Sequence, residues 1–169
     1  LFEPGPVILV ATNDGGRKNL MTITWHMVTD FTPALAITTG PWNHSFRALM
    51  KTKECVLAVP TVDIAETAIR IGDCSGANVD KFREFGLTPL PAADVSAPLV
   101  AECLACLECR VADYVEGPSI VLLRGVRAWI DAARKERRTF HAVGDGTFVV
   151  DGETMNLRHL MEDKLPPGV

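Results

Sequence analysis

Two short segments of the sequence carry side chains that could bind a phosphate group. Asn43, His44 and Ser45 precede apolar residues with helical spacing, and a helix N-terminus offers unpaired N–H groups and positive potential to an anion. Ser75 and Lys81 supply another hydroxyl and a cation further along the chain. Taken singly, Ser45 would be a helix N-cap and Lys81 a solvated helix lysine, so only convergence of the two segments would create a phosphate site.

A strand with short polar side chains precedes these two segments. Thr22 and Thr24 are interspersed with the apolar Leu20 and Ile23, and Trp25 follows directly. Short, neutral side chains leave the N–H and C=O groups of a strand edge accessible to a flat ligand with polar edges. We therefore expect Thr22, Ile23, Thr24 and Trp25 to form a platform for a cofactor.

Sequence motifs of several other chemistries are absent. Neither G-x-G-x-x-G nor G-x-x-x-x-G-K-[ST] occurs, which argues against a Rossmann nucleotide site and a P-loop. H-E-x-x-H and G-x-S-x-G are also absent, so neither a zinc protease nor a serine hydrolase is indicated.

Three cysteines have the C-x-x-C spacing that supplies metal ligands: Cys103, Cys106 and Cys109. Residues 99–115 contain no glycine or proline to turn the chain around an ion, so we expect one long strand. Along a strand, Cys103 and Cys109 face one way and Cys106 the other, over roughly 20 Å. Small buried packing residues are therefore the favoured interpretation, and no metal is expected.

The composition is that of one globular domain. The chain has 169 residues, of which 47% are hydrophobic and 22% are charged. Its net charge of −4 lacks the positive excess that is typical of nucleic-acid-binding proteins. The apolar runs are too short for a membrane span. No repeat or linker divides residues 1–169, so we expect a single domain. The isolated Cys55 and Cys74, without a secretory signal pattern, predict a cytoplasmic protein.

The order of elements predicts a mainly β protein with short helices. Strands are expected at residues 6–13, 19–29, 34–39, 55–60, 99–115, 120–130 and 147–150. Helices are expected at residues 43–52, 63–71, 80–85 and 157–161, whereas residues 88–98 should have no regular structure. Asp14-Gly15-Gly16 predicts a tight turn between the first two strands. Strands joined by hairpins and short helices, without repeating βαβ units, favour a closed or Greek-key barrel over a doubly wound sheet.

In this order the segments resemble the flavin reductase-like family of FMN-binding split barrels, which includes flavoredoxins and NAD(P)H:flavin oxidoreductases. The matching pieces are PVILVATNDGG, NLMTITW, VTDFTPALAIT, the helix that starts at HS, CVLAVP, SGANVDKFREFGL and LVAECLACLEC. They lie within residues 5–130. The chain departs from the family at Thr32-Pro33, usually two prolines, at Ser45, usually threonine, and at Ala58-Val59-Pro60, usually NVP.

The resemblance implies a split β-barrel of Greek-key type that binds FMN. Thr22, Ile23, Thr24 and Trp25 would line the edge of the flavin ring with their backbone. The residues implied for the ribityl and phosphate oxygens are Thr39, Asn43, His44, Ser45 and Ser75, with Lys81 as the phosphate cation. None of the departures removes a needed group, since serine keeps the hydroxyl of threonine.

The resemblance also implies hydride transfer from NAD(P)H to the flavin with no catalytic side chain, because the flavin itself carries the redox chemistry. The alternative is a non-enzymatic electron carrier of flavoredoxin type that accepts electrons from a redox protein partner. A third interpretation is a split-barrel protein that binds haem or a pyridoxal phosphate relative. Family members pair as homodimers, in which the basic residues 134–138 could reach a partner's FMN phosphate or a nicotinamide dinucleotide, although most such runs are solvated faces.

Overall fold

The computed structural model describes residues 5–161, which form eleven strands and three α-helices. The strands are β1 (Ile8–Asp14), β2 (Arg17–Ile23), β3 (His26–Val28), β4 (Ala34–Thr38), β5 (Glu54–Val59), β6 (Pro89–Leu90), β7 (Leu99–Val100), β8 (Ala105–Val115), β9 (Ile120–Ile130), β10 (Phe140–Ala142) and β11 (Phe148–Val150). The helices are α1 (His44–Thr52), α2 (Ala65–Gly72) and α3 (Lys81–Glu84), with 3-10 turns η1 (Val62–Ile64) and η2 (Arg158–Leu160). The ends of the single-domain prediction, residues 1–4 and 162–169, lie outside the described residues.

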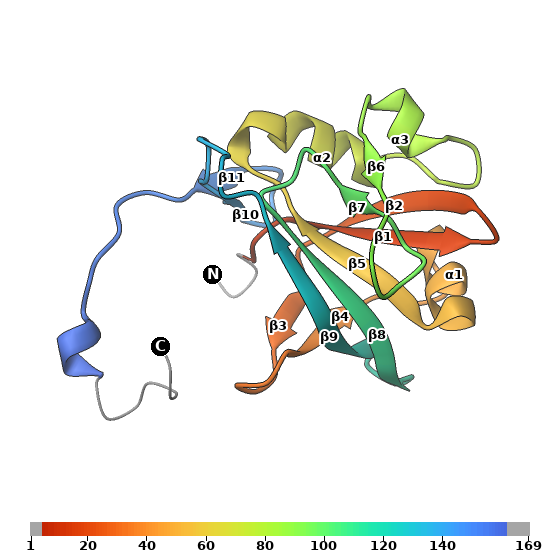
Figure 1. Cartoon of the computed structure of the whole chain (residues 1–169), viewed down its shortest axis with the longest axis horizontal. Coiled ribbons are helices and arrows are strands. Elements are labelled where there is room, and N and C mark those ends of the chain that lie inside the picture. The colour runs from red at the N-terminus through yellow and green to blue at the C-terminus, as the bar shows by residue number, and fades with distance from the viewer. Residues whose placement is uncertain (1–4, 162–169) are drawn as a thin grey trace.

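Seven of the strands form one curled sheet with the order β2-β1-β5-β8-β9-β4-β3. Every neighbouring pair in this sheet is antiparallel. The sheet curls into a half-barrel, with α1 near one end and α2 and α3 on the other side of β1 and β2 (Figure 1). The predicted mainly β, split-barrel fold is confirmed.

The β1–β2 hairpin confirms the predicted tight turn. Gly15 and Gly16 have φ angles of 60° and 94°, and Asp14 pairs directly with Arg17. Two consecutive residues with positive φ form the turn whose twist matches that of the flanking strands, and glycine adopts this conformation without steric cost.

The expected single strand over residues 19–29 is wrong, because the chain changes ladder partner in its middle. Ile23, the last residue of β2, pairs with Ile8 of β1, whereas His26 at the start of β3 pairs with Ile37 of β4. Strands β2 and β3 are the two edges of the sheet. The short link through Thr24 and Trp25 therefore joins one edge of the curled sheet to the other.

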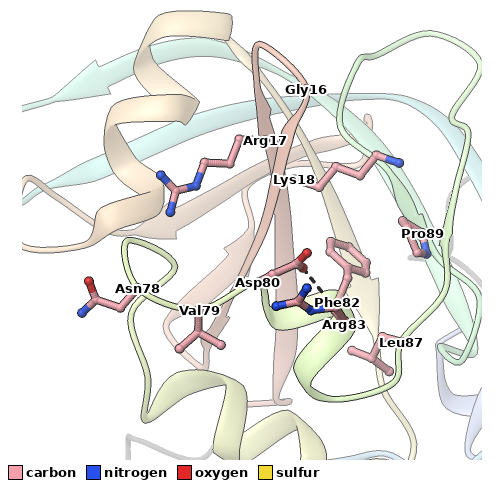
Figure 2. A pocket seen from close by; sticks show the side chains of 10 residues that line it. All are labelled: Gly16, Arg17, Lys18, Asn78, Val79, Asp80, Phe82, Arg83, Leu87 and Pro89. Atoms are coloured by element: carbon pink, nitrogen blue, oxygen red, sulfur yellow. Dashed lines mark hydrogen bonds between the residues drawn. The ribbon is translucent and has the colours of Figure 1, made fainter.

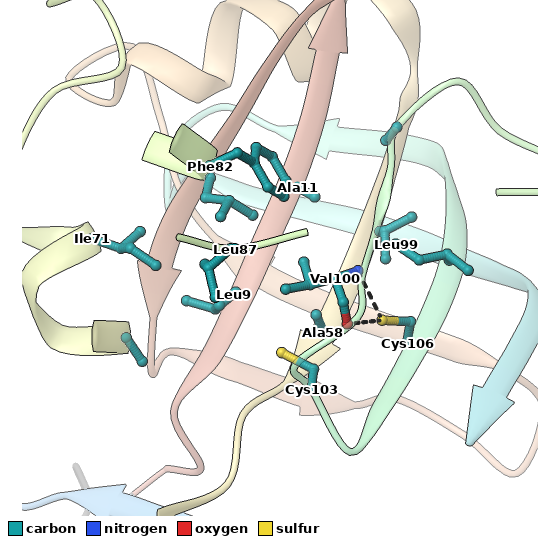
Figure 3. Packing of buried hydrophobic residues seen from close by; sticks show 14 of the residues in the cluster. Leu9, Ala11, Ala58, Ile71, Phe82, Leu87, Leu99, Val100, Cys103 and Cys106 are labelled. Carbon is teal, nitrogen blue, oxygen red and sulfur yellow. Dashed lines mark hydrogen bonds between the residues drawn. The ribbon is translucent and has the colours of Figure 1, made fainter. Parts of the chain in front are cut away.

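Two hydrophobic cores lie on opposite faces of β1. Ile8 and Val10 belong to the core inside the half-barrel, which Leu49 of α1 helps to close. Leu9 and Ala11 belong to the second core, which α2, α3 and the segment after α3 cover (Figure 3). Because both faces of β1 are buried, its sequence is a continuous apolar run rather than an alternating pattern.

The expected long strand over residues 99–115 is also wrong, since the chain turns at residues 101–104 between β7 and β8. Cys103 lies in this turn, where its N–H donates to the Val100 carbonyl (3.2 Å). It packs in the same core as Cys106 (Figure 3), while Cys109 faces the core inside the half-barrel. Burial raises the pKa of the Cys103 and Cys106 thiols, so both behave as packing residues.

Smaller elements depart from the expectations. Residues 88–98 contain β6, which pairs with β7, and the predicted strand near residue 148 gains a partner, β10, that the sequence analysis missed. The predicted helix at residues 157–161 is only the 3-10 turn η2, and it lies on an exposed segment that extends away from the barrel (Figure 1). Within residues 5–161, no helix has the length and apolar character to cross a membrane.

Candidate functional site

A two-lobed cleft lies beside the edge strand β2. We call its first part the polar lobe, a cavity of about 300 Å³ formed by β2, the start of α1, the end of α2 and the loop that leads to α3. The second part, the tryptophan lobe, has a volume of about 230 Å³ and is lined by residues 22–25, Thr38, Trp42 and Asn43. Thr22, Trp42 and Asn43 line both lobes, so the lobes adjoin. Together they have the size range of small-molecule and cofactor sites.

The polar lobe brings the predicted phosphate segments together. The predicted residues that line it are Thr22, Asn43, His44, Ser45, Ser75 and Lys81. They come from β2, the start of α1, the loop after α2 and the first residue of α3, which lie far apart in the sequence. The fold therefore supplies the convergence that would make a phosphate site out of residues that, singly, have ordinary structural roles.

The tryptophan lobe contains the predicted ring platform. Thr22, Ile23, Thr24 and Trp25 all line it. Because β2 is an edge strand, its outward N–H and C=O groups have no neighbouring strand among residues 5–161 to pair with, whereas the Trp25 carbonyl accepts from the Thr38 N–H (2.9 Å). The Thr22 hydroxyl is not available to a ligand in this lobe. It donates to the Ala68 carbonyl of α2 (2.5 Å) and so joins the strand to that helix.

Ser45 is not the N-cap of α1, contrary to the expectation. The N-cap is Asn43, which has extended backbone angles and makes no side-chain capping bond. Ser45 lies in the first turn, is only 2% exposed, and its Oγ accepts a hydrogen bond from Asn19 Nδ2 (2.8 Å). Its hydroxyl is thus free of a capping role and lies in the wall of the polar lobe.

Thr39 is the predicted site residue that lines neither lobe. It is fully buried, and its hydroxyl accepts a hydrogen bond from Asn43 Nδ2 (3.0 Å) and faces Met21 Sδ at 3.9 Å. The structure thus places Thr39 behind Asn43, where it orients that side chain.

Lys81 is not a solvated helix lysine. It is 3% exposed, and its ammonium donates to the Ile71 carbonyl at the end of α2 (2.7 Å). Asp80 caps α3 by accepting from the Arg83 N–H, which fixes the helix start and with it the position of Lys81. Burial lowers the pKa of Lys81, and no carboxylate among residues 5–161 pairs with it. A lysine that is desolvated without an acidic partner is a favourable place for an anion.

Positive charge extends beyond Lys81. The pKa of His44 is lowered from its usual 6.5, first by burial and then by the charges of Arg17, Arg47 and Lys81. Arg17 also donates to the carbonyls of Gly76 (2.6 Å) and Ala77 (2.7 Å), which pins the loop that forms one wall of the polar lobe. Neither Arg17 nor Arg47 was predicted from the sequence, because their role depends on where the hairpin and α1 meet.

His44 gives a pH-dependent stability that can be measured. Its pKa is lower in the folded chain than in the unfolded chain, so the unfolded state takes up the proton first as the pH falls. We expect this contribution to be fully present above pH 6.5, to fall below it, and to level off below the folded pKa. Urea unfolding between pH 8 and 5 should show a flatter profile for His44→Gln than for the natural chain. An unchanged profile, or an NMR titration of His44 at or above pH 6.5, would contradict this expectation.

Trp42 is a further lining residue that the sequence analysis missed. A Cβ atom on Gly40 would lie 2.2 Å from its ring, so the ring packs directly on the Gly40 backbone. Gly40-Pro41 was interpreted only as the end of a strand. The Gly-Pro-Trp order could have indicated an aromatic side chain folded back over the chain, since a missing Cβ permits close approach.

A second cavity of about 560 Å³ lies near the hairpin turn (Figure 2). Arg17, Lys18 and Arg83 supply charge at its rim, and Phe82 and Leu87 form part of its apolar floor. None of the predicted site residues lines it. The segment that leads from α2 into α3 contributes lining residues to both this cavity and the polar lobe.

Two of the basic residues 134–138, Arg134 and Arg138, form ion pairs within the chain itself. Arg134 donates to the Asp63 carboxylate (2.8 Å) and to Thr61 Oγ1 (2.9 Å), and its side chain is only 14% exposed. Arg138 pairs with Glu136 (2.6 Å). These two arginines therefore stabilise the segment after β9 in this conformation.

Comparisons with known proteins agree with this architecture. The family model described as "Flavin reductase like domain" matches residues 2–150. A protein of Archaeoglobus fulgidus is 33% identical over 101 residues, which are 59% of this chain and 57% of that relative's length. The flavoredoxin of Desulfovibrio vulgaris (Miyazaki F) superposes with a TM-score of 0.84 at 24% identity, over 90% of each chain. The NADH:FAD oxidoreductase SgcE6 of Streptomyces globisporus C-1027 superposes with a TM-score of 0.74 at 22% identity, over 86% of this chain and 85% of that one. The chain therefore belongs to the flavin reductase-like family.

Proposed function

We propose that the two-lobed cleft binds FMN and that the protein is an NAD(P)H-dependent flavin reductase. The observation that carries the proposal is the convergence of Ser45, Ser75 and Lys81 in the polar lobe, directly beside the backbone edge of β2 in the tryptophan lobe. A hydroxyl-rich, cationic pocket suits a phosphate, and an open strand edge suits the polar rim of a planar ring.

The side chains that line the two lobes suit FMN. Lys81 carries a buried charge without an acidic partner, and the buried Ser45 hydroxyl lies in the same wall. The apolar and aromatic surfaces of Trp25 and Trp42 border the tryptophan lobe. When bound, FMN would supply the redox chemistry, accepting a hydride from the nicotinamide.

The residues of the chain then have binding and orienting roles. Lys81 and Ser45 would hold the phosphate, Asn43 would contact the ribityl chain where the lobes meet, and the 22–25 backbone would hydrogen-bond the ring edge. No acid–base pair is required of the protein, because a hydride transfer moves no proton onto a side chain. The lobes open to solvent beside Trp42, which is 65% exposed, so a nicotinamide could approach from that side.

The visible spectrum of the purified protein tests this proposal. We expect flavin absorption bands after reconstitution with FMN, and bleaching of these bands when NADH or NADPH is added without oxygen. Steady oxidation of NAD(P)H with added FMN should follow. A protein that takes up no flavin would overturn the proposal, and a haem or pyridoxal phosphate spectrum would identify a different ligand.

The alternative is a flavoredoxin-type electron carrier, which the superposition with the flavoredoxin of Desulfovibrio vulgaris favours. The two functions share the same binding residues. They differ in turnover: a carrier would keep one FMN per chain through gel filtration and oxidise neither NADH nor NADPH at a measurable rate, while a redox protein partner would reduce it.

A further inference from the structure

The side chain of Asn19 forms the buried wall behind Ser45 in the polar lobe. Asn19 is 6% exposed and lies on β2, one strand position from Leu20 of the core. Its Nδ2 donates to Ser45 Oγ (2.8 Å), a bond that joins the edge strand to the first turn of α1. Asn19 therefore determines which way the Ser45 hydroxyl can point.

The direction of this hydrogen bond has a chemical consequence. A serine hydroxyl carries one proton and two lone pairs. Because Ser45 Oγ accepts from Asn19, its own proton is available for another acceptor, and none lies within reach among residues 5–161. The proton is thus left to be donated into the lobe, where an anion would accept it. With the amide reversed, Ser45 would donate to Asn19 and present only lone pairs to the lobe.

The nitrogen end of the Asn19 amide faces Ser45, and the oxygen end does not. Within residues 5–161, Asn19 Oδ1 and Thr12 Oγ1 are buried without a hydrogen-bond partner, and Thr12 is the direct cross-strand partner of Asn19. Both residues border a cavity of about 30 Å³, which has room for one water molecule. A water there would satisfy both oxygens.

Gly76 holds the amide from the other side. A Cβ atom at Gly76 would lie 2.1 Å from Asn19 Oδ1 and 2.6 Å from Nδ2, so the amide packs directly on the glycine backbone. Arg17 in turn holds the Gly76 carbonyl at 2.6 Å. The amide is therefore confined between the loop after α2 and the first turn of α1.

We propose that Asn19 is a positioning residue of the phosphate subsite: its Nδ2 commits the Ser45 proton to a phosphate group bound in the polar lobe. The inference rests on the proposed function for the identity of the ligand, FMN. It goes beyond that function because Asn19 acts through Ser45.

Asn19→Asp tests the proposal by reversing the polarity at nearly constant shape. The carboxylate can only accept, so Ser45 must donate to it, and the lobe loses its proton donor. We expect FMN affinity to fall by about tenfold to a hundredfold, the range for a hydrogen bond to a charged group, while riboflavin affinity changes little. Fluorescence titrations with FMN and riboflavin give the ratio of the two affinities. Retained riboflavin binding shows that the variant is folded.

Asn19→Asp also introduces a negative charge near the phosphate subsite, and a double-mutant cycle with alanine variants avoids this charge. Asn19→Ala should lower the FMN-to-riboflavin affinity ratio in the natural chain but have little further effect in a Ser45→Ala background, because its target is already gone. Thr12→Val is the matched control: it removes an equally buried, unpartnered polar atom on the neighbouring strand and should leave the ratio unchanged. Additive effects of Asn19→Ala and Ser45→Ala, or an equal change in Thr12→Val, would overturn the proposal.

Thermal unfolding with inorganic phosphate tests the positioning role of Asn19 independently of flavin binding. We expect phosphate to raise the thermal midpoint of the natural chain and to have a smaller effect on Asn19→Asp. If the protein binds no flavin but shows this Asn19-dependent protection, the flavin function fails and the positioning role stands. If phosphate gives no protection and FMN does not bind, both are overturned.

Discussion

Replacing Lys81 by methionine is expected to weaken FMN binding by about tenfold to a hundredfold, with a much smaller loss for riboflavin. Lys81 is the buried cation of the polar lobe, and its only hydrogen bond within residues 5–161 is to the Ile71 carbonyl. A charge-assisted bond to phosphate, desolvated by the surrounding protein, is stronger than a neutral one. Methionine keeps the length of the side chain and removes the charge.

The same substitution removes the donor to the Ile71 carbonyl, which should lower stability by about 1–3 kcal/mol. That effect is common to both ligands, so the diagnostic quantity is the ratio of the FMN and riboflavin dissociation constants from fluorescence titration. Lys51→Met is the matched control, because Lys51 lies on α1, is 67% exposed and pairs with Asp14. It changes the net charge equally and should leave the ratio unchanged. Equal losses for FMN and riboflavin in Lys81→Met would argue against a phosphate role.

Glu108→Gln is expected to destabilise the fold more than other single polar substitutions in the sheet. Glu108 is fully buried on β8, and its carboxylate accepts from the backbone N–H groups of Ala93 (3.0 Å), Asp94 (2.6 Å) and Val95 (3.1 Å) and from Trp129 Nε1 (2.6 Å). The NH₂ group of glutamine cannot accept, so buried donors would lose their partner. We expect a loss of about 3–5 kcal/mol, or about 10 °C in the thermal midpoint.

Glu108 also predicts an acid-sensitive stability. Burial raises the pKa of its carboxyl, but the hydrogen bonds from Ala93, Trp129, Asp94 and Val95 outweigh it, and the pKa lies below the usual 4.5. Its contribution is therefore present above pH 4.5 and is lost as the pH falls through the lower folded value. Urea unfolding from pH 7 to 3 should show this loss in the natural chain and less of it in Glu108→Gln.

Glu102→Gln is the control for this experiment. Glu102 also accepts a backbone N–H in the same region, from Thr88 (3.0 Å), but that bond is exposed to solvent. We expect its substitution to change the thermal midpoint by much less, since water can replace the lost partner. Comparable losses in the two variants would show that the burial of Glu108 is not what stabilises the segment.

Elements that are determined by residues close to one another in the sequence were predictable from it. The Gly15-Gly16 turn was predicted because glycine adopts the positive φ angles of this turn without steric cost. The α1 region was predicted because its apolar spacing is a local, helical one. The breaks at Thr24-Trp25 and at residues 101–104 were not, because a strand ends there when its ladder partner changes, and the partner is distant in the sequence.

The candidate site divides in the same way. The residue types that suit a phosphate and a ring edge, with Ser45, Lys81 and residues 22–25 among them, were identified from the sequence, and the order of their segments indicated the family. Their proximity, the burial of Lys81 and the direction of the Asn19–Ser45 hydrogen bond were decided only by the tertiary structure. The physical reason is that side-chain chemistry is carried by each residue alone, whereas desolvation and hydrogen-bond direction depend on what the folded chain packs around it.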